Sequence, residues 1–88
     1  MARRNSLDFE PVLSSQALEV FLGLTKTRQR KLAKVLYELA SPPFREPDYL
    51  TRDSTGRLLS NVRVGDFIVT YWLDRSPMEL RVVDLVEL

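Results

Sequence analysis

Seven consecutive residues, FIVTYWL at 67–73, carry no charge and follow the turn dipeptide Gly65-Asp66. Such a dipeptide between two strand-like runs predicts a tight hairpin of type I′ or II′. The strand after it is apolar on both faces, whereas a strand with one wet face alternates apolar and polar residues. We therefore expect either that both faces of this strand are covered or that one apolar face is left open for a partner.

Two helices are predicted in the first half of the chain. Apolar residues within 13–22 recur at i, i+3 and i+4, and Gly23 is placed to end this helix in the left-handed conformation. Thr25 can cap a second helix, in which apolar residues over 32–39 recur at i, i+3, i+4 and i+7. Pro42 prevents its continuation. Because the connecting loop is short, the helices should form an antiparallel hairpin.

Strands are predicted on either side of these helices. Leu7 and Phe9 alternate with polar residues and predict a short first strand that Pro11 closes. Later strands are predicted at about 57–64, 67–73 and 79–87, with Tyr49, Leu50 and Thr51 as a further short strand. The order predicts one α+β domain over residues 1–88, with the N-terminal strand and the helix hairpin on one face of a mostly antiparallel sheet of about four strands.

Composition excludes several kinds of chemistry. The 88 residues include no cysteine and no histidine, which removes disulfides, thiolate metal sites and the usual acid–base group near neutral pH. We therefore expect no metal and no cofactor. We also expect no membrane span, because no apolar run approaches 18 residues. No apolar stretch of the kind a signal peptide requires follows the N-terminal arginines, so a cytoplasmic location is expected.

The strand at 67–73 divides into two faces. Strand alternation places Ile68, Thr70 and Trp72 on one of them and Phe67, Val69, Tyr71 and Leu73 on the other. The same alternation separates Arg81, Val83 and Leu85 from Leu80, Val82, Asp84 and Val86. Two helices can cover only one side, and an uncovered apolar face on a small protein marks an interaction site. A partner protein, a second copy in a homodimer and an N-terminal arm are the alternatives for what covers it.

Basic residues gather in the segment TKTRQRKLAK at 25–34, which contains no acid. Cations in the first turns of a helix oppose the helix dipole, at a cost of about 0.3–1 kcal/mol each. A sequence that keeps them despite this cost can use the charge to bind phosphate or an acidic partner. The alternative is a solvated helix face. Arginine also presents a fork suited to phosphate, although Arg52 and Arg57 can instead pair with nearby acids. The candidate RNA or phosphate ligands are Lys26, Arg28, Arg30, Lys31, Arg52 and Arg57. Net charge +1 and a pI near 8.1 are low for a large nucleic-acid surface, which typically has a pI above about 9.

Four segments together resemble the RelE/ParE superfamily of bacterial type II toxin–antitoxin systems. They are DFEP, LASPP, GR…VRVGDFIVTYW and ELRVVDLVEL, and they extend over nearly the whole chain. The resemblance implies two helices on an antiparallel sheet, a role in plasmid stabilisation, a bacterial cytoplasmic location and a cognate antitoxin that blocks the concave sheet face. The antitoxin-binding groove would then include Ile68, Thr70 and Trp72.

The resemblance implies two kinds of activity. RelE-like members inhibit translation as mRNA interferases that cut mRNA on the ribosome without metal, and ParE-like members bind DNA gyrase. Arg63 matches a common family arginine, and Arg63 and Arg81 are the candidate catalytic residues. Where RNA-cleaving members carry ionisable side chains or an arginine, this chain has Leu59, Asn61 and Ile68. A gyrase-binding toxin and a non-toxic binding member are therefore the alternatives to a metal-independent endoribonuclease.

Overall fold

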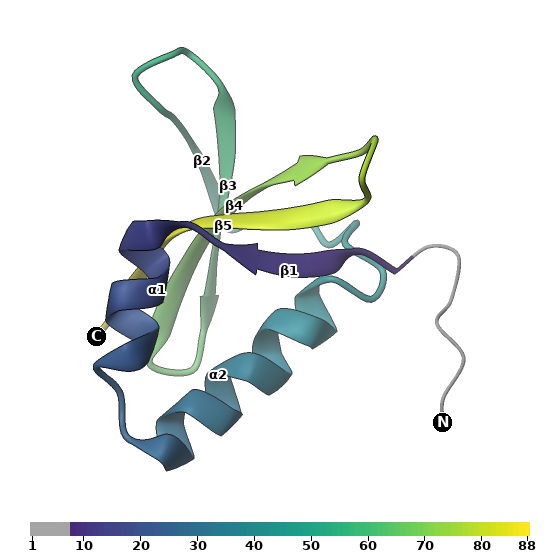
Figure 1. Cartoon of the computed structure of the whole chain (residues 1–88). Helices are drawn as coiled ribbons and strands as arrows, with labels where there is room; N and C mark the ends of the chain where they lie inside the picture. The colour runs from purple at the N-terminus through teal and green to yellow at the C-terminus, as the bar shows by residue number, and fades with distance from the viewer. Residues whose placement is uncertain (1–7) are drawn as a thin grey trace.

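A computed structural model describes residues 8–88 and contains two helices and one five-stranded sheet. The elements in chain order are β1 (Glu10–Leu13), α1 (Ser15–Leu22), α2 (Lys26–Leu39), β2 (Tyr49–Arg52), β3 (Leu58–Val64), β4 (Phe67–Asp74) and β5 (Glu79–Glu87). The sheet order is β1-β5-β4-β3-β2 (Figure 1). The α+β prediction is confirmed, but the sheet has five strands rather than about four, because both short outer strands join it.

The first strand lies further along the chain than its sequence pattern predicts. Leu7 falls outside the described residues, and β1 begins at Glu10 and includes Pro11. β1 is an edge strand that pairs in parallel with β5, with Glu10 opposite Glu79 and Leu13 opposite Val82. An edge strand tolerates proline because one side of its backbone needs no ladder partner. Pro11 therefore does not close the strand, as the sequence analysis expected.

Side-chain caps fix where both helices begin. The Ser14 hydroxyl accepts a hydrogen bond from the Ala17 N–H at 3.1 Å, and the Thr25 hydroxyl accepts one from the Arg28 N–H at 3.3 Å. Gly23 ends α1 with φ −78°, so the expected left-handed ending was wrong. Figure 1 shows the helices diverging from the loop between them, and the pair is more open than the antiparallel hairpin that a short loop predicts.

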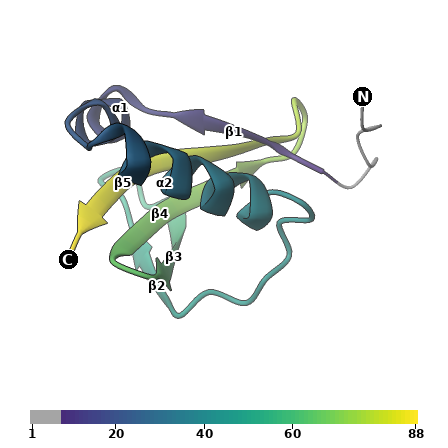
Figure 2. The same cartoon turned by 90° about the horizontal axis from the view of Figure 1, so that it is seen from below.

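The core lies between the helices and one face of the sheet. Both helices are on the same side of the sheet, and no helix of the described chain covers the other side (Figures 1 and 2). The largest fully buried side chains come from α2, β3, β4 and β5, and they are Leu32, Val62, Val69, Leu80 and Val82. Burying this apolar surface is the main stabilising contribution to the fold.

Two irregular features set the direction of side chains in the hairpins. Gly65 has φ +57° while Asp66 has no positive φ, so the β3–β4 turn is of type II′ rather than I′. Between β4 and β5 a register shift places Thr70 opposite Asp84 and the next residue, Tyr71, opposite Val82. Such a bulge interrupts simple alternation along β5.

The bulge corrects the predicted faces of β5. Trp72 lies opposite Arg81, and directly opposed residues of antiparallel strands share a face. Arg81 therefore lies on the uncovered side with Asp84 and Val86, whereas Leu80, Val82 and Leu85 are buried beneath the helices. Simple alternation had grouped Arg81 with Leu85 and Asp84 with Leu80.

Candidate functional site

The side of the sheet turned away from the helices is the candidate site, and we refer to it as the open sheet face. Strand register assigns its residues, because facing partners point to the same side. They are Tyr49 and Thr51 of β2, Leu59, Asn61 and Arg63 of β3, Ile68, Thr70, Trp72 and Asp74 of β4, and Glu79, Arg81, Asp84 and Val86 of β5. The predicted groove residues therefore do share the uncovered side.

A buried polar cluster occupies the middle of the open sheet face. Asn61 is only 3% exposed. Its amide nitrogen donates to the Thr51 hydroxyl at 3.0 Å and to the Tyr49 carbonyl at 3.3 Å, and its amide oxygen accepts from the Thr70 hydroxyl at 2.7 Å. A buried polar network with its partners in place is rigid and specifies one arrangement. The open face is thus partly polar, and not the continuous apolar patch that the FIVTYWL stretch suggests.

Trp72 lies beside this cluster, surrounded by charge. The Arg57 guanidinium lies over the Trp72 ring, 3.9 Å from the ring centroid, and the Arg81 guanidinium is 5.8 Å from it. Arg81 also pairs with Asp74 at 3.1 Å and with Glu79 at 2.8 Å. The side chain of Arg81 is therefore held in place by two carboxylates, and its charge is balanced locally.

Arg63 is the more available of the two candidate catalytic arginines. It lies opposite Ile68 and is exposed, and within residues 8–88 its guanidinium makes a single long hydrogen bond, 3.5 Å, to the Gly65 carbonyl. The Asp48 carboxylate accepts the Arg63 backbone N–H at 2.7 Å and so fixes its main chain. Arg81 faces Trp72, four residues further along β4, which separates the two arginines by about 13 Å along the strand.

The ionisable side chains of this face, apart from its arginines, are Tyr49 and Asp84, together with Asp74 and Glu79, the two carboxylates paired with Arg81. Tyr71 belongs to the helix side, as alternation predicts, and burial raises the pKa of its hydroxyl above the ordinary value. Asp84 is the acid that sequence reasoning missed, because only the bulge places it opposite Thr70 on the open face. Its carboxylate accepts hydrogen bonds from Gln16 at 3.4 Å and from the Leu85 N–H at 2.9 Å.

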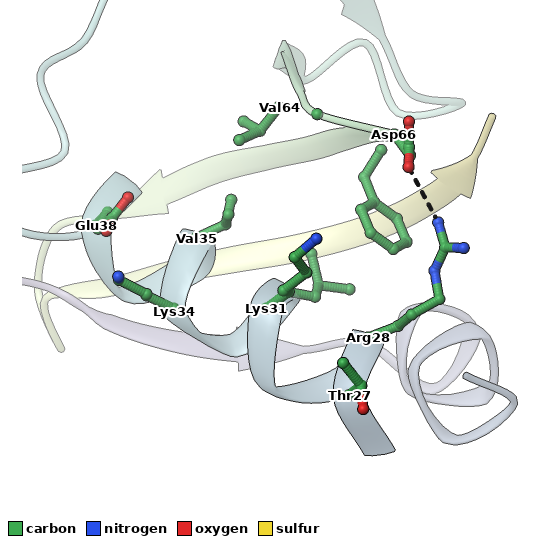
Figure 3. A pocket seen from close by; sticks show the side chains of 11 residues that line it. Thr27, Arg28, Lys31, Lys34, Val35, Glu38, Val64 and Asp66 are labelled. Atoms are coloured by element: carbon green, nitrogen blue, oxygen red, sulfur yellow. Dashed lines mark hydrogen bonds and ion pairs between the residues drawn. The ribbon is translucent and has the colours of Figure 1, made fainter. Parts of the chain in front are cut away.

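The cations of α2 belong to a different surface. Figure 3 shows a groove between α2 and the β3–β4 hairpin, with Lys31 and Lys34 on α2 and Val64 across from them. Its volume is about 460 Å³. Arg52 and Arg57 belong to the β2–β3 hairpin at the opposite end of the molecule (Figure 1). The six predicted phosphate ligands therefore do not form a single site.

Arg28 is engaged in contacts within the protein. Its guanidinium pairs with Asp66 at 3.3 Å, with Glu87 at 2.8 Å, and lies 5.5 Å from the Phe67 ring centroid. These contacts connect the start of α2 to the β3–β4 turn and to the end of β5. We therefore infer that Arg28 has a structural role, although its charge alone made it a candidate phosphate ligand.

Arg28→Ala should lower the free energy of unfolding by about 1 kcal/mol, because partly exposed ion pairs and a cation–π contact each contribute a fraction of that amount. Urea denaturation at low salt measures the loss, and 1 M NaCl should reduce it by screening. Arg30→Ala, an exposed position on the same helix, is the matched control and should have little effect. Equal stability of the two variants would contradict the structural role.

The fold of the chain is shared with several solved structures. No protein-family model matches the sequence, and no curated protein matches it either. Among solved structures, a chain of the RelBE2 toxin–antitoxin complex of Mycobacterium tuberculosis superposes with a TM-score of 0.75 at 12% identity, covering 98% of both chains. A chain of the Escherichia coli RelBE complex gives 0.69 at 17% identity, covering 91% of this chain and 96% of that one.

The isolated E. coli RelE toxin also matches, with a TM-score of 0.69 at 16% identity, and the match covers 90% of this chain and 83% of the toxin. An archaeal RelE–RelB complex from Pyrococcus horikoshii OT3 gives 0.67 at 16% identity. The chain thus has the fold of the RelE toxins. No helix of residues 8–88 is long and apolar enough to cross a membrane.

Proposed function

We propose that this chain is the toxin of a type II toxin–antitoxin pair and that it inhibits translation by binding mRNA on its open sheet face. The RelE fold supports a toxin role, since the similar solved structures are toxins or toxin–antitoxin complexes. The observation that carries the proposal is the open sheet face itself. It presents an available arginine, Arg63, and a tryptophan flanked by two further arginines.

RNA binding is better supported than RNA cleavage of the kind that RelE-like toxins carry out. Cleavage of RNA through its 2′-hydroxyl needs a base, a cation for the phosphorane and an acid for the leaving oxygen. Leu59 and Ile68 cannot move protons, and Asn61 is neutral with its amide committed to hydrogen bonds. Arg63 can supply the cation, and Asp84 is a carboxylate of the same face, whereas Asp74 and Glu79 are paired with Arg81. If the chain cleaves RNA, Arg63, Asp84 and Arg81 are the residues we would assign to the reaction.

The antitoxin is proposed to occupy the same face. Ile68, Thr70 and Trp72 lie in one row along β4 on the open sheet face, and Trp72 is only partly buried. An antitoxin segment bound across these three residues would prevent mRNA from reaching Arg63 and Trp72. Neutralisation would then be competition for one surface, in the cytoplasm of a bacterial host.

A cell-free translation assay with the purified chain tests the proposal. We expect dose-dependent loss of protein synthesis at micromolar toxin, restored by addition of the cognate antitoxin. Primer extension on the same mRNA separates binding from cleavage, since intact message accompanies inhibition by binding alone. Undiminished synthesis would refute a translational target.

A gyrase-binding role is the second candidate, and the non-ionisable side chains Leu59, Asn61 and Ile68 on the open sheet face favour it. A supercoiling assay with purified gyrase distinguishes the two targets. Loss of supercoiling together with normal translation would replace the first proposal with the second. Normal growth on induced expression would instead indicate a binding protein without toxicity.

A further inference from the structure

We infer that Trp72 and Arg57 form a subsite for one nucleobase, which stacks at the end of the open sheet face. The inference rests on the proposed function, because it identifies which part of the RNA this face recognises. The inference is based on the position of the Arg57 guanidinium, which lies over the ring of the partly buried Trp72, 3.9 Å from the ring centroid. Bases of single-stranded RNA stack on aromatic rings and on guanidinium planes.

The β2–β3 turn holds Arg57 in position. One Asp53 carboxylate oxygen accepts the Arg57 N–H at 3.0 Å, the Thr55 N–H at 2.9 Å and the Thr55 hydroxyl at 2.6 Å. The Thr55 hydroxyl, as the main cause, holds the pKa of Asp53 below its ordinary value. Gly56 completes the turn with φ +86°, which favours glycine. The backbone that carries Arg57 is therefore fixed, while its side chain remains exposed.

Rigid neighbours also hold the tryptophan. Leu59, which is 7% exposed, and the Asn61 network lie beside Trp72 on the same face and are packed or hydrogen-bonded. Arg81, tied to Asp74 and Glu79, lies 5.8 Å from the ring centroid. Because the Arg57 guanidinium already covers one face of the ring, the base stacks on the outer plane of that guanidinium, and a pair held in this way loses little freedom when a ligand binds.

Charge decides between a phosphate and a base as the ligand here. Arg57 and Arg81 carry two positive charges, and Asp74 and Glu79 carry two negative ones, so the cluster around Trp72 is neutral. A neutral cluster attracts a phosphate weakly, whereas stacking of a flat ring needs no net charge. The available charge at Arg63, further along the sheet, suits the backbone phosphate of the same strand.

Trp72 is the only tryptophan of the chain, so its fluorescence reports directly on the subsite. Titration with octaadenylate should quench the Trp72 emission, while an abasic octamer with the same number of phosphates should bind more weakly and leave the emission nearly unchanged. Equal quenching by both oligomers would overturn the inference, because the base would then play no part.

Variants extend the test through the anisotropy of a labelled octamer. Arg57→Ala and Trp72→Leu should each weaken octaadenylate binding about tenfold, whereas Trp72→Phe, which keeps a ring, should weaken it less than threefold. Arg75→Ala removes the same charge from an exposed turn and should stay within twofold of wild type. Circular dichroism confirms that each variant is folded, and unchanged affinity of Trp72→Leu would refute the subsite.

The outcomes separate this inference from the proposed function. Inhibited translation without Trp72 quenching by RNA leaves the toxin assignment in place and removes the base subsite. Quenching by the antitoxin but not by RNA assigns the cluster to a protein partner and likewise overturns the inference. Normal translation with base-dependent quenching keeps the subsite and removes the translational target.

Discussion

Leu80→Ala is expected to lower the free energy of unfolding by about 3 kcal/mol, within the range for a buried leucine truncated to alanine. Leu80 is fully buried on the helix side of β5, and partial relaxation around the missing methyl groups would leave a cavity. Small domains have only about 5–15 kcal/mol of stability, so the loss is a large part of the total. Urea denaturation followed by far-UV circular dichroism measures it.

Leu22→Ala provides the matched control for this prediction. Leu22 is 64% exposed near the end of α1, so the same chemical change removes little buried area. We expect a change within about 0.5 kcal/mol. A similar loss for both variants would mean that the layer between helices and sheet is not the core.

Trp72→Ala is expected to weaken binding of the cognate antitoxin about 30-fold, equivalent to the 2 kcal/mol of an interface hot spot. Trp72 lies on the open sheet face, outside the main core, so its loss should lower the stability of the free toxin by less than it lowers binding. Isothermal titration calorimetry and urea denaturation on the same variant give the two numbers.

Tyr37→Ala is the aromatic control for the antitoxin prediction. Tyr37 is 54% exposed on α2, on the helix side of the molecule. Its replacement should leave antitoxin affinity within about threefold of wild type. Equal antitoxin binding by wild type and Trp72→Ala would show that the partner does not use the open sheet face.

Local sequence signals predict most of the fold. The Gly65-Asp66 hairpin and the helix cap at Thr25 appear where their residues place them, because each depends on neighbours in the chain. The short strand at 49–51 also forms, extended by one residue to Arg52. The position of β1 was less predictable, since edge pairing with β5 decides whether Pro11 is tolerated.

The composition of the open face was harder to predict. The bulge near Tyr71 depends on pairing between two strands, and it moves Arg81 and Asp84 relative to simple alternation. In the sequence Asn61 is simply a polar residue within β3. In the structure its buried amide forms hydrogen bonds with Thr51 of β2 and Thr70 of β4, so it connects three strands. Charge alone could not separate Arg28, which is held in ion pairs, from the exposed Arg63.

The central claim is that the open sheet face, and not the basic surface of α2, acts on translation. Two double variants, each removing two positive charges, test it: Arg57→Ala with Arg63→Ala on the open side, and Lys31→Ala with Lys34→Ala on α2. In cell-free translation the open-face variant should need at least about tenfold more protein for half-inhibition, equivalent to a loss of at least about 1.4 kcal/mol of binding free energy. The α2 variant should stay within about twofold of wild type. Loss of inhibition in the α2 variant alone would contradict the account and assign the activity to the helix side.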